Sequence, residues 1–236
     1  LNGDAFVLHL YDALFAMPDW TTEKQAQLIR CARRADLIVT SSKEIQDGLP
    51  PDVVEKAETI ENGADVEAFS NGKNMPPPSE LQALKGPLIG CCGVMSQKTD
   101  IDLLHHIALT RPEWTLVLIG PYFFGRNPAQ DRIWRQMAEL KNVLWLGLMS
   151  PDKLPQYVGH MDINLIPYRI DDPNAGWAKY CFPLKLHEYL ATGKAVISSK
   201  LPTIEKFADV LSFATDQEDW IRKIESALAE DSFEAQ

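Results

Sequence analysis

From residue 87 onward, the chain alternates short apolar runs with segments in which apolar residues recur at helical spacing. Such an alternation is typical of a parallel sheet that is covered by helices on both faces. The pattern therefore predicts a complete α/β domain of the doubly wound, Rossmann-like type. Its six strands are expected at residues 88–92, 115–119, 143–146, 162–166, 195–198 and 210–213.

Caps and apolar stripes predict the helices between these strands. Thr99 is expected to cap the first helix, with Asp102 in its first turn and an apolar stripe that includes Ile101, Leu104 and Ile107. Further helices are expected at residues 128–140, 151–158, 183–192 and 217–229.

A different block precedes this domain. Residues 6–10 and 37–40 are predicted strands, and residues 22–34 form a predicted helix between them. Two or three strands cannot bury both faces of a sheet, so we expect this block to pack on other parts of the protein. The predicted organisation is a partial N-terminal domain at 1–72, a proline-containing linker at 73–84, a complete domain at 85–215 and a C-terminal helix at 216–236 that packs back toward the first domain.

Composition excludes several classes of function. The net charge is -10, and a negative field repels phosphate backbones, so a nucleic-acid partner is not expected. There is no apolar run of about 20 residues that would span a membrane, and the four cysteines lack the paired spacing of a zinc site or a disulfide framework. We expect a cytoplasmic protein with reduced cysteines.

Ligands of an open parallel sheet bind beyond the carboxyl ends of its strands, which directs attention to a few loops. Gly93 to Lys98 follow the first strand of the larger domain, where a glycine admits close approach of a phosphate. A plain strand-to-helix turn explains Gly93 equally well. The glycine patterns of dinucleotide-binding folds and of phosphate-binding loops do not occur in the sequence.

The most informative stretch is residues 182–196, in which Pro183 opens a predicted helix, Gly193 closes it and an apolar strand follows. Lys185 and Glu188 are three positions apart, so they share one face of the first turns. Lys185 can bind a phosphate there, while Glu188 accepts hydrogen bonds from a sugar diol. The alternative is an ion pair on the surface of the helix.

This stretch resembles the nucleotide-sugar segment of glycosyltransferase family 4, in which a P-x-K-x-x-E-Y-x-A-x-G-K-P-V run closes the donor site; Ala195 replaces the last proline. The resemblance extends to the ADLIVTSS run at 35–42, the NGAD turn at 62–65 with Phe69, Ile89-Gly90 with Gly93, and the strand exits at 118–121, 142–147 and 162–167. It implies a GT-B fold, with a remnant of the acceptor domain at 1–72 and the nucleotide-sugar donor domain at 85–215. The chain resembles better a subgroup that makes bacterial surface polysaccharides, which has an N-P-L-K-L-x-E-Y form, although Phe182 replaces the asparagine here.

The resemblance also implies roles for individual residues. Glu188 is matched to the glutamate that binds the ribose hydroxyls, and Lys185 to a lysine near the diphosphate. Tyr180 stands where many members have a second glutamate that faces the transferred sugar, so recognition of the sugar is left open. Further candidates are Lys98 for phosphate, Gly147 and Met149 for the base through their backbone, Leu184 in the donor site, Arg169 for the leaving diphosphate, and His9 and Asp12 for the transferred sugar and acceptor.

We therefore expect a retaining, metal-independent glycosyltransferase that moves a sugar from a nucleotide diphosphate-sugar to a glycan or lipid-linked acceptor, in synthesis of cell-surface polysaccharide. No cofactor or metal is expected, since His105 and His106 are adjacent and diverge on a helix. Arg30, Arg33 and Arg34 suggest contact with the inner face of the plasma membrane, or only a solvated helix end. A non-catalytic nucleotide-sugar-binding module and a nucleotide-sugar 2-epimerase are the alternatives.

Overall fold

The computed structural model describes residues 5–171 and 176–234. The chain divides into two compact units, and each is described by itself. The first unit comprises residues 1–63, 170–183 and 201–206, and the second comprises residues 64–169, 184–200 and 207–236. The units are thus interleaved along the sequence, whereas the predicted boundary was a single linker at 73–84.

The first unit is built on a parallel sheet in the order β1-β2-β3, formed by Val7–Leu10, Leu37–Thr40 and Ala57–Thr59. Register places Val7 opposite Leu37 and Ile38 opposite Ala57. The predicted helix is present as α1 at Thr22–Arg34, with Thr21 as its N-cap, and the short helices η1 (Leu14–Ala16), α2 (Lys43–Asp47) and α3 (Pro51–Val54) complete the unit. β3 was not predicted, because its three residues are too few to show a period.

Two segments that are distant in sequence join this first unit. The hydroxyl of Ser42 donates to the Tyr180 carbonyl at 2.8 Å, and the amide of Asn62 donates to the Phe182 carbonyl at 2.8 Å. Tyr180 and Phe182 belong to the first of these segments, residues 170–183, which carries the 3-10 helix η2 (Gly176–Tyr180). The second segment, residues 201–206, carries most of the 3-10 helix η3 (Pro202–Phe207). These bonds between side chains and backbone explain why the range 85–215 is not one continuous domain.

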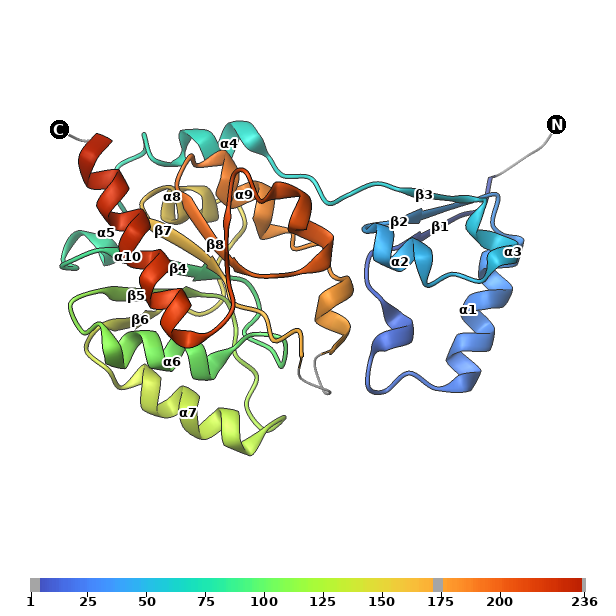
Figure 1. Cartoon of the computed structure of the whole chain (residues 1–236), viewed down its shortest axis with the longest axis horizontal. Coiled ribbons are helices and arrows are strands. Elements are labelled where there is room, and N and C mark those ends of the chain that lie inside the picture. The colour runs from blue at the N-terminus through green and yellow to red at the C-terminus, as the bar shows by residue number, and fades with distance from the viewer. Residues whose placement is uncertain (1–4, 172–175, 235–236) are drawn as a thin grey trace. The chain divides into compact units, whose positions relative to one another are not determined.

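The second unit contains a six-stranded parallel sheet in the order β6-β5-β4-β7-β8-β9 (Figure 1). The strands are β4 (Leu88–Cys92), β5 (Thr115–Ile119), β6 (Val143–Trp145), β7 (Ile163–Ile166), β8 (Ala195–Ser199) and β9 (Ser212–Ala214). All six lie where the sequence predicted them, to within two residues. The order of connection reverses between β4 and β7, which is the position where ligands bind in open parallel sheets.

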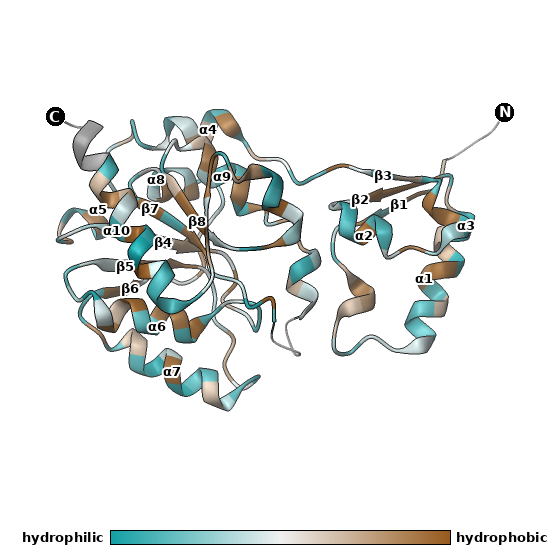
Figure 2. Cartoon of the chain, viewed as in Figure 1, coloured by the Kyte–Doolittle hydropathy of each residue, from teal (hydrophilic) through white to brown (hydrophobic). Residues whose placement is uncertain are grey.

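Helices cover both faces of this sheet (Figure 1). One face packs against α6 (Ile101–Thr110), α7 (Pro128–Ala138) and α10 (Gln217–Glu234). The helices α4 (Val66–Gly72), α8 (Leu154–Gly159) and α9 (Lys185–Ala191) pack together, and α9 contacts β7 and β8. The short helix α5 spans Ser79–Gln82. Figure 2 shows apolar residues concentrated in the central strands. Asp100, not Thr99, caps α6, because its carboxylate accepts from the Leu103 N–H at 3.0 Å.

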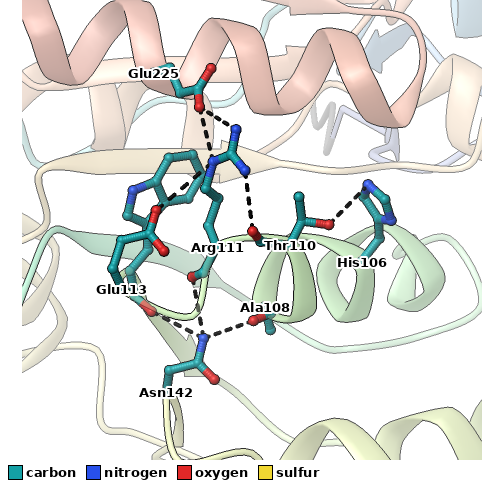
Figure 3. A network of polar contacts seen from close by, with 8 residues as sticks. His106, Ala108, Thr110, Arg111, Glu113, Asn142 and Glu225 are labelled. Atoms are coloured by element: carbon teal, nitrogen blue, oxygen red, sulfur yellow. Dashed lines mark hydrogen bonds and ion pairs between the residues drawn. The ribbon is translucent and has the colours of Figure 1, made fainter.

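The C-terminal helix α10 packs on the sheet of the second unit, to which it belongs. Trp220, Ile221 and Ile224 are buried in the core beside α6. A polar network supports this packing (Figure 3): the Arg111 guanidinium at the end of α6 donates from Nε to Glu225 of α10 at 2.9 Å. The apolar stripe predicted for this helix is therefore confirmed, and its partner is the second unit.

Residues 64–84, which include the predicted linker, are part of the second unit because α4 packs closely against α8. A Cβ atom on Gly72 would lie 2.0 Å from the Pro155 carbonyl oxygen, and one on Gly159 would lie 2.4 Å from the Lys73 nitrogen. Only glycine permits two helix backbones to approach this closely.

Substitution of Gly72 by alanine should therefore destabilise the second unit. The obstacle is backbone, which cannot rotate away, so we expect a loss of about 3 kcal/mol in the free energy of unfolding, at the upper end of overpacking effects. Gly63→Ala is the matched control, since a Cβ there meets nothing within 4 Å. Denaturant unfolding of both variants tests this, and equal stabilities would contradict the close contact.

Candidate functional site

The loops that leave β4 and β7 meet at the point where the strand order reverses. The Arg169 N–H donates to the Lys98 carbonyl at 2.7 Å, and the Asp100 N–H donates to the Pro167 carbonyl at 2.8 Å. Thr99 and Tyr168 form an antiparallel bridge between the same loops. Residues 93–100 and 167–169 are therefore one hydrogen-bonded platform at the carboxyl edge of the sheet.

Two glycines bring the neighbouring strand exits against this platform. Gly93 and Gly120 have φ angles of +110° and +135°, which side chains disfavour. A Cβ on Gly120 would lie 2.0 Å from the Gly93 carbonyl oxygen. The Gly93 N–H donates to Ile119 at 2.8 Å and the Gly120 N–H donates to Gly147 at 2.7 Å, so the exits of β4, β5 and β6 are joined in sequence.

Lys185, the first residue of α9, extends over Gly93. A Cβ atom on Gly93 would lie 3.0 Å from the Lys185 ammonium nitrogen. Burial lowers the pKa of this ammonium, but its interactions with Tyr168, Cys91 and Cys92 outweigh burial, and the pKa lies above its ordinary value. Lys185 is therefore a permanent positive charge beside exposed backbone.

Glu188 lies one turn further along α9 and is half-buried. Burial raises the pKa of its carboxyl, and the Lys185 ammonium opposes that rise. The helix is held in place by Tyr189, whose buried hydroxyl accepts from the Cys92 N–H at 2.7 Å. This bond fixes Lys185 and Glu188 relative to the end of β4.

Lys98 joins this group, as its ammonium lies 4.8 Å from the centre of the Tyr168 ring. The Lys185 ammonium lies 5.3 Å from the centre of the same ring. The structure thus brings together Gly93, Lys98, Lys185 and Glu188, four of the residues that the sequence selected. It adds Tyr168, to which sequence reasoning gave no role; an aromatic residue directly after a strand at the reversal point was the available signal.

Arg169, which the sequence suggested for the leaving diphosphate, pairs with two carboxylates. Its guanidinium forms ion pairs with Asp100, at 3.3 Å, and with Asp102. Asp100-Ile101-Asp102 is an Asp-x-Asp sequence, a pattern associated with manganese in some glycosyltransferases, and the prediction of metal independence overlooked it. Here its carboxylates cap α6 and pair with Arg169. Within residues 5–171 and 176–234 there is no group of three or more potential metal ligands.

Gly147 and Met149 follow β6 in the same unit, and Leu184 immediately precedes α9. Gly147 has a φ of +65°, and the Leu148 side chain beside it is 82% exposed. Trp145 supports this exit by donating from its indole to the Gly120 carbonyl at 2.8 Å. Leu184 is 64% exposed.

His9, Asp12 and Tyr180 belong to the first unit. His9 is exposed and lies edge-on to Tyr11 with 6.1 Å between ring centres, while the Asp12 carboxylate accepts from the Cys181 thiol at 3.6 Å. The Tyr180 ring packs edge-on against Phe15 at 5.3 Å, on the core of that unit. Tyr180 is therefore a packing residue within its own unit.

The chain is similar in sequence to known proteins. The profile of the family described as glycosyl transferases group 1 matches residues 86–230, and the chain belongs to this family. TuaH of Bacillus subtilis (strain 168), whose name assigns it provisionally to teichuronic acid biosynthesis as a glycosyltransferase, is 36% identical over 187 residues. That match covers 78% of this chain and 45% of TuaH, so the chain spans less than half the length of this relative.

Solved structures share the fold. Anabaena HepE in complex with UDP-glucose superposes with a TM-score of 0.74 at 18% identity, over 97% of this chain and 64% of that one. A sucrose-phosphate synthase from Thermosynechococcus elongatus gives a TM-score of 0.71 at 15% identity, over 94% of this chain and 59% of that one. The prediction of an α/β fold of the GT-B type is confirmed.

The raised pKa of Glu188 predicts that the protein is more stable without this charge. The cost of burying the carboxylate is absent below the ordinary pKa of about 4.5, where the group is protonated in both states, and is complete above the raised folded-state pKa. Glu188→Gln should therefore have a higher Tm than the wild type at neutral pH, and this difference should vanish as the pH falls. Glu218→Gln, at an 86% exposed side chain, is the control with no expected difference; a lower Tm for Glu188→Gln at neutral pH would contradict the prediction.

Proposed function

We propose that the second unit binds a nucleotide diphosphate-sugar and that the protein transfers its sugar to an acceptor hydroxyl. The observation that carries this proposal is the Lys185 ammonium over the open backbone of Gly93, with the Glu188 carboxylate one turn away. A cation beside exposed backbone suits a diphosphate, and a carboxylate at that spacing suits a ribose diol. HepE and the sucrose-phosphate synthase have the same fold, and HepE has been solved with UDP-glucose.

In this proposal the chain's own cations promote departure of the nucleotide. Negative charge grows on the diphosphate as its bond to the sugar breaks, and a fixed ammonium stabilises that charge more in the transition state than in the ground state. Lys185 and Lys98 supply this stabilisation without a metal ion. By analogy with the resembling family, the diphosphate itself helps to deprotonate the acceptor on the same face of the sugar, so that configuration at the anomeric carbon is retained.

The name of one relative supports a proposal for the class of acceptor. TuaH is named for teichuronic acid biosynthesis. We propose that this protein likewise extends a glycan or lipid-linked acceptor of a cell-surface polysaccharide, in the cytoplasm and in contact with the membrane. Among residues 5–171 and 176–234, no helix is long and apolar enough to cross a membrane.

One observation favours a second candidate, a module that binds the nucleotide-sugar without turnover. Tyr180, at the position where many members of the family have a glutamate facing the sugar, packs against Phe15. A site without that carboxylate has one contact fewer to the transferred sugar. Turnover of UDP-glucose, GDP-mannose or ADP-glucose by the protein with an acceptor preparation decides between the two candidates.

Calorimetric titration with UDP, GDP and ADP tests the donor site directly. We expect one nucleotide to bind best, and Glu188→Ala to weaken it by roughly tenfold to a hundredfold, because hydrogen bonds to a charged group contribute about 1.5–3 kcal/mol. Glu218→Ala is the matched control, because this exposed glutamate lies on α10. Binding that is equal in the wild type and in Glu188→Ala would remove the assignment of the ribose site.

A further inference from the structure

We infer that Tyr168 is a positioning residue, which holds Lys98 and Lys185 together as a pair of cations ready for the diphosphate. The inference rests on the proposed function and goes beyond it, since it assigns a role to Tyr168 through its contacts with the two lysines. Its basis is one juxtaposition. Both ammonium groups lie against a single aromatic side chain at the point where the strand order reverses.

The two lysines contact Tyr168 in different ways. The Lys98 ammonium lies 4.8 Å from the ring centre, within the range of a cation–π interaction. The Lys185 ammonium lies 5.3 Å from the ring centre, and its interaction with the phenol of Tyr168 raises the pKa of the ammonium. The ring therefore contacts both lysines, and the phenol adds an electrostatic interaction with Lys185.

Tyr168 itself is rigid. It is 5% exposed, and its N–H donates to the Ser199 hydroxyl at 2.9 Å at the end of β8. Its backbone also bridges to Thr99, and the next residue donates to the Lys98 carbonyl. The same loop thus fixes both the ring and the main chain of Lys98.

This arrangement solves a physical problem of the site. Two ammonium groups repel one another, and each lysine side chain loses considerable rotational freedom when it is ordered. An electron-rich ring and a phenol oxygen offset the repulsion and order both side chains before any ligand arrives. A diphosphate that binds to cations already in place loses less entropy, which is the general advantage of preorganisation.

Lysine NMR tests the geometry without any ligand. Reductive methylation with ¹³C-formaldehyde keeps the lysine charge. The ring current of Tyr168 should shift the methyl resonances of Lys98 and Lys185 upfield, and the variants Lys98→Arg and Lys185→Arg assign these resonances. In Tyr168→Leu both resonances should move to the position of exposed lysines, and in Tyr168→Phe the Lys98 resonance should remain shifted. Unshifted resonances in the wild type would overturn the inference.

Binding tests the consequence. The quantity to compare is the affinity for the nucleoside diphosphate that binds, UDP, GDP or ADP, divided by the affinity for the corresponding nucleoside. This ratio should fall roughly tenfold in Tyr168→Leu and roughly threefold in Tyr168→Phe, as expected for a desolvated cation–π contact. Tyr157→Leu is the control: Tyr157 is buried in α8, where burial and the Glu80 carboxylate raise the pKa of its hydroxyl. Its loss should lower Tm and leave the ratio unchanged.

The outcomes separate the two proposals. An unchanged ratio in Tyr168→Leu would overturn the positioning role while nucleotide binding itself stands. Equal falls in Tyr168→Leu and Tyr157→Leu would also overturn it, because both would then reflect lost stability. If the wild type binds none of the three nucleotides, the proposed function fails, and the lysine resonances still decide whether Tyr168 holds the two cations.

Discussion

The hydrogen bonds that join the loops after β4 and β7 are the constraint on which the candidate site depends. The order of the strands reverses between these two strands, and the helices α6 and α9 that follow them lie on opposite faces of the sheet. The bond from Arg169 to the Lys98 carbonyl and the bond from Asp100 to the Pro167 carbonyl join the two loops at this reversal. Without them, Lys98 and Tyr168 would have no fixed relation.

Positive side chains gather at the candidate site although the protein as a whole is negatively charged. The protein carries a net charge of -10, yet Lys98 and Lys185 gather at the carboxyl edge of the sheet. Arg169 lies beside them and is paired with Asp100 and Asp102. Arg169 therefore stabilises the loop through its ion pairs, while Lys98 and Lys185 both lie against the Tyr168 ring, a difference that residue type alone does not reveal.

Glycines take a comparable part in shaping the site and the fold. Gly93 and Gly120 allow the exits of β4 and β5 to touch through their backbones, and leave room above Gly93 for the Lys185 side chain. Gly72 and Gly159 do the same between α4 and α8. A side chain at Gly72, Gly120 or Gly159 would push apart the two backbones that meet there, so these positions require glycine.

Much of the second unit was predictable because its signals are local. The strands at β4 and β5 have the predicted bounds, and Lys185 and Glu188 lie on one helix, as their spacing of three required. The first unit was harder. β3 is too short to show a period, and residues 176–183 join this unit through bonds from Ser42 and Asn62 that no sequence pattern announces.

The sequence by itself determined the parallel α/β architecture and the residues of α9, because hydrophobic period, caps and closing glycine act over a few neighbouring positions. Only the tertiary structure decided that Tyr168 lies against both lysines, that Arg169 is paired with Asp100 and Asp102, and that α10 packs on the second unit. Those outcomes depend on contacts between residues far apart in the chain. The local sequence around a charged or aromatic residue does not show which distant residue it will contact, and only the packed fold decides this.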